Sequence, residues 1–230
     1  MAGLKAVFFD GGNTLLELDY PWLTDLARRL GANRAAPEAI GLAGARLLRE
    51  RSLRYGRTPP VQDAQAVFEE SFAAIAAEIG LPPAAAVEFA RRSRREDQEH
   101  PQGLWRCPAP GAQATLAALR ARQLRLGVIS NSDGQAQAHL ELAGLATHLD
   151  LVIDSSQVGV EKPHPAIFRL ALAQFGLAST EAVYVGDLLD LDVLGARGAG
   201  LAPYLYDRFG AYPDVTEPRI RSLSELLDLL

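Results

Sequence analysis

At 230 residues, 48% of them hydrophobic, the chain is long enough for a domain with a sizeable insert and too apolar for a disordered polymer. Its net charge of −5 argues against binding to nucleic acid, because proteins that contact the phosphate backbone usually carry a basic excess. A single cysteine excludes an internal disulfide framework, and neither a signal pattern nor a membrane-length apolar run is found, so we expect a cytoplasmic protein with no membrane partner.

The first predicted element is a short buried strand over Leu4–Phe9, followed by a long helical stretch. From about residue 20 to residue 100 the pattern is helical throughout. Four apolar residues share one face of a predicted helix: Phe68, Phe72, Ile75 and Ile79. Breaks between helices are expected at Asn33–Pro37, Arg57–Pro60 and Gly80–Pro83. The charged run Arg91–Glu99 is predicted to be a solvated helix face.

After Pro110 the pattern alternates between helix and strand. Helices are expected at 112–123, 134–143, 165–175, 191–199 and 223–229, and strands at 126–129, 151–153, 182–185 and 202–206. Such alternation predicts βαβ units and a parallel sheet covered by helices on both faces. We therefore expect an α/β fold with a Rossmann-like, doubly wound core (residues 1–16 and 101–230) and an all-α cap inserted at residues 17–100.

Chemistry-bearing side chains follow the predicted strands. Asp10 comes directly after the first strand, and Ser130 and Asn131 follow the strand at 126–129. Lys162 lies in the loop beyond residue 153. A group of acids follows the strand at 182–185: Asp187, Asp190 and Asp192. Because the carboxyl ends of parallel strands meet at one edge of the sheet, we expect these side chains to converge there.

Each of these signals also has an ordinary structural explanation. Asp10 could be a turn residue, and Ser130 and Asn131 could cap the next helix. Lys162 could be a solvated loop lysine, and the acids after the strand at 182–185 could favour a helix N-terminus through its dipole. Their order along the chain and their shared position at strand ends favour a catalytic site over coincidence.

The same segments carry a resemblance to a known family. Together with Asp10, three phrases resemble the four sequence motifs of the haloacid dehalogenase (HAD)-like hydrolases: Val-Ile-Ser-Asn-Ser-Asp-Gly, Val-Gly-Val-Glu-Lys-Pro-His-Pro and Val-Gly-Asp-x-x-x-x-Asp-Val-Leu-Gly-Ala-Arg. The resemblance covers residues 4–16 and about 104–203, and the insert matches only in position and helical character. It implies a phosphatase-type member of the superfamily, with a helical cap after the first motif.

The resemblance also implies a role for each residue. Asp10 would attack phosphorus and form an aspartyl-phosphate, while Lys162 would neutralise charge on Asp10 and on the phosphoryl group. Phosphate would be bound by Ser130, Lys162 and backbone amides near Asn131. Mg²⁺, a hard ion that prefers oxygen ligands, would be held by Asp10, the backbone carbonyl of Gly12, Asp187 and Asp192, with Asp190 as the alternative to Asp192.

Position 12 departs from the family pattern, in which phosphatases usually carry a second Asp two residues after the nucleophile. Gly12 has no side chain, and a positioned acid or base typically contributes 10²–10⁴-fold to a rate. A substrate with a good leaving group, such as an acyl or aryl phosphate, needs little protonation. Alternatively, another group supplies the proton, for which Glu17 and Asp19 are nearby in sequence, or turnover has been lost.

We therefore expect a Mg²⁺-dependent phosphohydrolase that acts on a small phosphorylated metabolite, slowly because of Gly12. The alternative is a non-catalytic protein that binds a phosphorylated ligand or a protein partner on the same scaffold. A dehalogenase is less favoured, since members with that activity usually carry an aromatic residue at position 12. No feature of the sequence indicates an oligomeric state.

Overall fold

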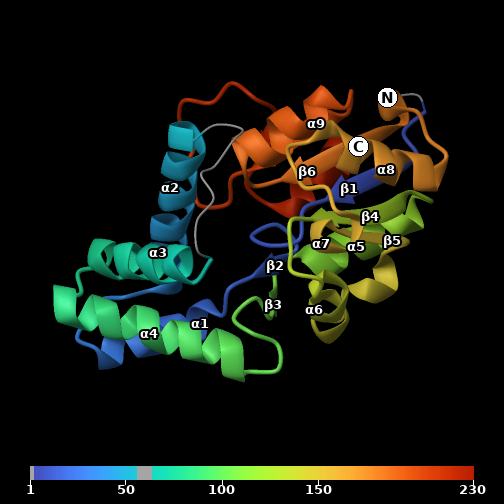
Figure 1. Cartoon of the computed structure of the whole chain (residues 1–230). Helices are drawn as coiled ribbons and strands as arrows, with labels where there is room; N and C mark the ends of the chain where they lie inside the picture. Colours follow the sequence, from blue (N-terminus) through green and yellow to red (C-terminus); the bar gives the residue numbers. More distant parts are fainter. Residues whose placement is uncertain (1–2, 56–63) are drawn as a thin grey trace. The chain divides into compact units, whose positions relative to one another are not determined.

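The computed structural model describes residues 3–55 and 64–230 (Figure 1). The chain divides into two compact units. The first, a core unit, comprises Met1–Glu17, Cys107–Arg208 and Asp214–Leu230. The second, an insert unit, comprises Leu18–Arg106 and Phe209–Pro213. The short segment Phe209–Pro213 groups with the insert unit, where Phe209 packs against Tyr20 with 5.8 Å between ring centroids.

The core unit is built on a six-stranded sheet in the order β5-β4-β1-β6-β7-β8, in which every neighbouring pair is parallel (Figure 1). Its strands are β1 (Ala6–Phe9), β4 (Arg125–Ser130), β5 (Leu151–Asp154), β6 (Ala182–Gly186), β7 (Ala202–Tyr206) and β8 (Arg219–Ile220). The predicted α/β architecture is confirmed. The two-residue strand β8 was not predicted, because so short a strand has no periodicity to detect.

Side chains of β1 alternate between two hydrophobic clusters, one on each face of the sheet. Val7 and Phe9 pack in the cluster that also contains Leu116 of the helix α5 (Ala112–Ala121). Phe8 packs in the opposite cluster with Phe168 of the helix α8 (Pro165–Phe175). Because both faces of β1 are buried, the strand is apolar throughout, as is typical of a parallel sheet covered by helices on both sides.

The helices of the core unit follow its strands in the expected alternation. They are α5 (Ala112–Ala121), α6 (Ala136–Leu142), α7 (Ser155–Val158), α8 (Pro165–Phe175), α9 (Gly195–Gly198) and α10 (Leu226–Leu229). Short 3₁₀ turns occur at Ala146–His148, Ser179–Glu181 and Leu223–Glu225. The helix expected at 191–199 is instead a π-helical turn, Leu189–Leu194, that runs into α9. Such a widened turn frequently occurs at functional sites.

The insert unit is helical, as expected. It contains α1 (Tyr20–Arg29), α2 (Pro37–Tyr55), α3 (Ala64–Glu78) and α4 (Pro83–Glu99). Phe72 stands between Phe68, stacked at 4.2 Å between ring centroids, and Phe89 of α4 at 6.3 Å. The break between α3 and α4 falls at Gly80, whose φ of +90° favours glycine. The break expected at Arg57–Pro60 lies outside the described residues.

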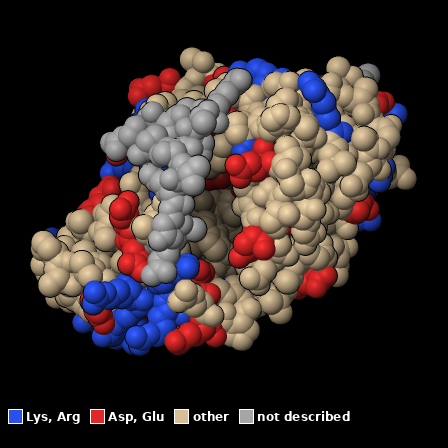
Figure 2. All heavy atoms as spheres, in the orientation of Figure 1, with Lys and Arg blue, Asp and Glu red and all other residues tan. Residues whose placement is uncertain are grey.

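The charged run at the end of α4 is a solvated face, as predicted. Arg91, Arg92 and Arg95 are exposed, and Arg92 pairs with Glu88 at 2.6 Å. Figure 2 shows Lys and Arg side chains gathered beside acidic ones at the lower left, where α1 and α4 lie in Figure 1. Such exposed pairs contribute little to stability.

Two further strands, β2 (Leu16–Glu17) and β3 (Cys107–Pro108), pair antiparallel in the core unit. They lie where the chain leaves the core unit and where it returns to it. Among the described residues, no helix is both long and apolar enough to span a membrane.

Candidate active site

The strand register brings three of the predicted site residues to one edge of the sheet. Phe9 of β1 lies opposite Val128 of β4 and Val185 of β6. The next residue, Asp10, donates its backbone N–H to the Val185 carbonyl at 2.8 Å. Asp10 therefore lies level with the ends of β4 and β6, where Ser130 and Asp187 follow, as expected for the carboxyl edge of a parallel sheet.

A buried ammonium joins two of the aspartates. Lys162 Nζ lies 2.5 Å from Asp10 Oδ1 and 2.7 Å from Asp192 Oδ1, and the whole Lys162 side chain is buried. Burial by itself would lower the pKa of Lys162, but the two carboxylates outweigh it and raise the pKa above its ordinary value. The lysine is thus a fixed cation of the site and not a solvated loop residue.

The nucleophile candidate is a weak acid in this setting. Burial raises the pKa of Asp10 from 3.8 to about 6, and the Asp192 charge adds to this rise while Lys162 opposes it. Burial, followed by the charges of Asp10 and Asp192, also raises the pKa of Asp187 well above its ordinary value. Both shifts come first from burial, and the neighbouring carboxylates add to them.

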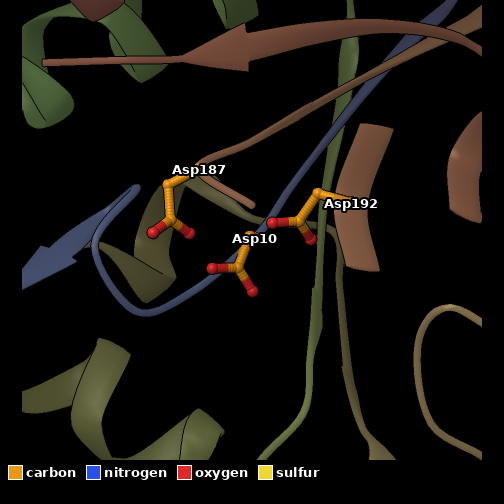
Figure 3. A group of neighbouring side chains, drawn as sticks. All are labelled: Asp10, Asp187 and Asp192. Atoms are coloured by element: carbon orange, nitrogen blue, oxygen red, sulfur yellow. The ribbon is translucent and has the colours of Figure 1, made fainter. Parts of the chain in front are cut away.

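Three carboxylates meet at this point. Oxygen atoms of Asp10, Asp187 and Asp192 all lie within 4.8 Å of one another (Figure 3). Three negative charges and the single positive charge of Lys162 leave a net −2, which a divalent cation would balance. An all-oxygen donor set of this kind suits Mg²⁺. The residues present therefore fit the expected metal.

Asp192 is held in place by the turn that carries it. Its Oδ2 accepts the Leu188 N–H at 2.9 Å, within the widened turn after β6. A Cβ atom at Gly186 would lie only 2.4 Å from the Asp192 carboxyl carbon, so only glycine allows the carboxylate to pack against the strand end. The geometry favours Asp192 over Asp190 as the acid that contacts Lys162.

The end of β4 contributes the hydroxyl of Ser130, and the loop that follows contributes the side-chain amide of Asn131. Ser130 is buried, and its Oγ would lie 3.0 Å from a Cβ placed on Gly11, so the hydroxyl stands directly beside the Asp10 loop. Asn131 instead pairs with the backbone of Lys162. Its Nδ2 donates to the Lys162 carbonyl at 3.0 Å, and its Oδ1 accepts the Lys162 N–H at 2.8 Å.

Both acids considered as replacements for the missing Asp have structural partners. Glu17 is buried and forms an ion pair with Arg208; its burial raises its pKa. Asp19 accepts the Trp22 N–H at 2.9 Å as the N-cap of α1 and pairs with Arg106 at 2.8 Å. Each carboxylate thus has a fixed role in its own unit.

The sequence reasoning missed one polar group of the site, the hydroxyl of Tyr184. It lies in β6, 3.1 Å from Lys162 Nζ and 3.0 Å from Asp192 Oδ1, and the side chain is fully buried. From the sequence, this residue was expected only to lie within the strand at 182–185. The sequence did carry a signal for this residue. A tyrosine between two valines, in a strand expected to be buried on both faces, needs a polar partner, because buried Tyr hydroxyls usually form a hydrogen bond.

Comparisons with known proteins agree with this class of fold. The family model described as haloacid dehalogenase-like hydrolase matches residues 4–200. The phosphoserine phosphatase of Thermus thermophilus is 35% identical over 238 residues, covering 93% of this chain and 92% of that protein. The pyrimidine 5′-nucleotidase YjjG of Escherichia coli is 38% identical over 128 residues, covering 54% of this chain and 56% of that protein.

A crystal structure of a dehalogenase with an intermediate complex covers 100% of this chain and 98% of its own, with a TM-score of 0.65 and 20% identity. That likeness shows the fold alone. The family model and the fold together define a hydrolase with a parallel-sheet α/β core, in which a buried aspartate and lysine pair lies at the sheet edge. The chain belongs to the haloacid dehalogenase-like hydrolases, which confirms the family expected from its motifs.

Proposed function

We propose that this chain is a Mg²⁺-dependent phosphohydrolase that acts on a small phosphorylated metabolite through an aspartyl-phosphate on Asp10. The observation that carries the proposal is the 2.5 Å contact between Asp10 and the buried Lys162, within a cluster of three carboxylates. Support also comes from a phosphatase relative that matches over nearly the whole chain. Phosphoserine is for that reason one of the substrates to test.

The metal would be held by Asp10, the Gly12 backbone carbonyl, Asp187 and Asp192. When bound, the ion would neutralise charge on the phosphoryl oxygens, which phosphoryl transfer needs more than elaborate covalent chemistry. The charge of Lys162 only partly offsets the effect of burial on Asp187, whose pKa stays well above its ordinary value. A bound cation would therefore stabilise the ionised form of Asp187.

The covalent step would use groups of this chain. An Asp10 carboxylate oxygen would attack phosphorus, forming an O–P bond as the bond from phosphorus to the leaving oxygen breaks. Ser130 and backbone amides near Asn131 would donate to the phosphoryl oxygens, and Lys162 would neutralise charge on Asp10 and on the phosphoryl group. Water would then attack phosphorus, releasing inorganic phosphate and restoring the Asp10 carboxylate.

The missing side chain at Gly12 limits the class of substrates that this proposal favours. The leaving oxygen takes up a proton as it departs, and position 12 has no side chain to donate one. Glu17 and Asp19 are each held by an arginine, so neither is an unengaged acid. We therefore favour substrates whose leaving group is stable without protonation, such as acyl or aryl phosphates, with slow turnover of alkyl phosphates.

A second function is favoured by the same glycine. A protein without an acid–base group could retain Mg²⁺ and phosphate binding and serve as a binder of a phosphorylated ligand or of a protein partner. A dehalogenase would use the same Asp10 nucleophile without needing a metal. The carboxylate cluster argues against this activity, because it could hold a metal ion. Cytoplasmic location remains a prediction from the sequence.

The test is phosphate release from an aryl phosphate and an acyl phosphate, with Mg²⁺ and with a chelator. Asp10→Asn removes the nucleophile, and Asp228→Asn, an exposed aspartate of α10, is the matched control. Mg²⁺-dependent release that is lost only in Asp10→Asn supports the proposal. Activity that survives in Asp10→Asn refutes the mechanism. No release from a folded wild-type protein that binds Mg²⁺ favours the binder.

A further inference from the structure

The ammonium of Lys162 has three buried partners, and the third is not a carboxylate. Besides Asp10 and Asp192, Lys162 Nζ lies 3.1 Å from the Tyr184 hydroxyl. An ammonium has three N–H donors, so these three acceptors account for all of them. Partners in three directions fix the position of the nitrogen, whereas two would leave it free to turn about the axis that joins them.

The Tyr184 hydroxyl also contacts the second carboxylate. It donates its single hydrogen to Asp192 Oδ1 at 3.0 Å, while the Ile129 carbonyl, at 3.3 Å, is the more distant acceptor. Lys162, Tyr184 and Asp192 therefore form a closed triangle of hydrogen bonds. Charge-assisted bonds of this kind are roughly twice as strong as neutral ones.

The phenol ring is held by the core and not by the site. Tyr184 is fully buried in β6, in the middle of the sheet. Its ring meets Phe168 of α8 edge to face, with 5.1 Å between centroids. Because α8 begins directly after the Lys162 loop, the same helix supports both the lysine segment and the ring.

We propose that Tyr184 is a positioning residue, whose hydroxyl holds the Lys162 ammonium and Asp192 in the arrangement that phosphoryl transfer requires. This inference rests on the proposed function for its catalytic consequence. Its structural content, that the hydroxyl restrains Lys162, does not depend on the activity. Lys162 would act on the phosphoryl group as charge develops, so loss of its restraint would affect kcat more than KM.

The variant Tyr184→Phe removes the hydroxyl and keeps the ring, and Tyr204→Phe makes the same change in the neighbouring strand β7 as a control. With an aryl phosphate and Mg²⁺, we expect kcat of Tyr184→Phe to fall about tenfold, the effect of one lost hydrogen bond of ~1.4 kcal/mol, with KM within about twofold. A purely structural role would lower the melting temperature and leave kcat unchanged.

A second readout needs no substrate. A buried ammonium held by three partners exchanges hydrogen slowly with water, so Lys162 should give a resolved ¹⁵N ammonium signal, assigned through its absence in Lys162→Met. We expect this signal to shift or broaden in Tyr184→Phe and to stay in place in Tyr204→Phe. In the unaltered protein, a cross-peak should connect the Tyr184 hydroxyl proton with the Lys162 side chain.

The outcomes separate the two proposals. An unchanged Lys162 signal in a folded Tyr184→Phe protein overturns the positioning role, and so does an unchanged kcat in an active enzyme. Should Tyr184→Phe fail to fold, the cross-peak in the unaltered protein decides, and its absence overturns the inference. If the wild type releases no phosphate, the proposed function fails, while a changed signal still supports the restraint of Lys162 by Tyr184.

Discussion

Gly186→Ala is the substitution for which the structure predicts the largest effect from a single methyl group. The added Cβ would lie 2.4 Å from the Asp192 carboxyl carbon and 2.6 Å from its Oδ2. Ordinary contacts between non-bonded carbon atoms are about 3.5–4.0 Å, so the carboxylate has to move. Asp192 is only 1% exposed and is bound by Lys162 and by the Leu188 N–H, so a movement breaks buried polar contacts.

The magnitude follows from these two costs. Overpacking a buried position usually costs about 1–3 kcal/mol, and breaking a buried ion pair costs about 3–5 kcal/mol when one charge is left alone. Since Lys162 keeps its contact with Asp10, we expect the free energy of unfolding to fall by roughly 3 kcal/mol in Gly186→Ala. Activity should fall at least tenfold, because Asp192 no longer restrains Lys162.

Urea unfolding followed by far-ultraviolet circular dichroism measures this loss. The matched control is Gly198→Ala at the end of α9, where a Cβ meets nothing within 4 Å and φ is not positive. There we expect a gain of about 0.4–1 kcal/mol from reduced freedom of the unfolded chain. Equal stabilities of Gly186→Ala and the wild type, or an equal loss in Gly198→Ala, would refute the reasoning.

Three other predictions concern the acid–base group, the metal and the lysine loop. Gly12→Asp should raise the rate of alkyl phosphate hydrolysis, by up to about 10²-fold, in a steady-state assay; an unchanged rate in a folded protein would mean that another group already serves. Burial raises the pKa of Asp10 to about 6, so its stabilising contribution is present below its ordinary pKa of 3.8 and is lost as pH rises through 6. Scanning calorimetry should therefore show a larger rise in Tm from Mg²⁺ at pH 7.5 than at pH 4.5, and Asp187→Asn should reduce it; an equal rise at both pH values contradicts this. Asn131→Asp removes the donor to the Lys162 carbonyl and should lower kcat several-fold in the same steady-state assay, with little change in Tm. Wild-type kinetics in this variant would show that the hydrogen bond from Asn131 is not needed for activity.

The parallel sheet could be predicted because each central strand is a continuous apolar run bounded by polar residues. β1, for example, is buried at all four positions and ends at Asp10. The strand β8 was not predicted, because two residues are too few to show a hydrophobic periodicity. The π-helical turn at Leu189–Leu194 was expected to be an ordinary helix, since its sequence has helical spacing. The widening shows in the backbone hydrogen bond from the Val193 N–H to the Leu188 carbonyl, five residues earlier. The same turn carries Asp192, whose contact with Lys162 depends on the tertiary fold.

The site was predictable to the extent that its groups follow strands. Asp10, Lys162 and Asp192 were expected to converge and do so, although their catalytic roles remain a proposal. Tyr184 could not be distinguished from a core aromatic residue, because the partner of its hydroxyl comes from a loop about twenty residues earlier in the chain. Phosphate binding at Asn131, through backbone amides, stays a prediction. The pairing of its side chain with the Lys162 backbone was not predicted, because it depends on how two loops pack.

The pKa shifts of the site have a consequence for how the protein works. Burial makes Asp10 a weaker acid than it is in water, and the charges of Asp10 and Asp192 make Lys162 a stronger base. A proton and a divalent cation would then compete for the same excess of negative charge. At neutral pH a divalent cation would bind in preference to a proton, because its two positive charges balance the net −2 of the cluster, whereas one proton leaves a charge of −1. Binding the metal would hold Asp10 ionised, and an ionised Asp10 is what attack on phosphorus requires.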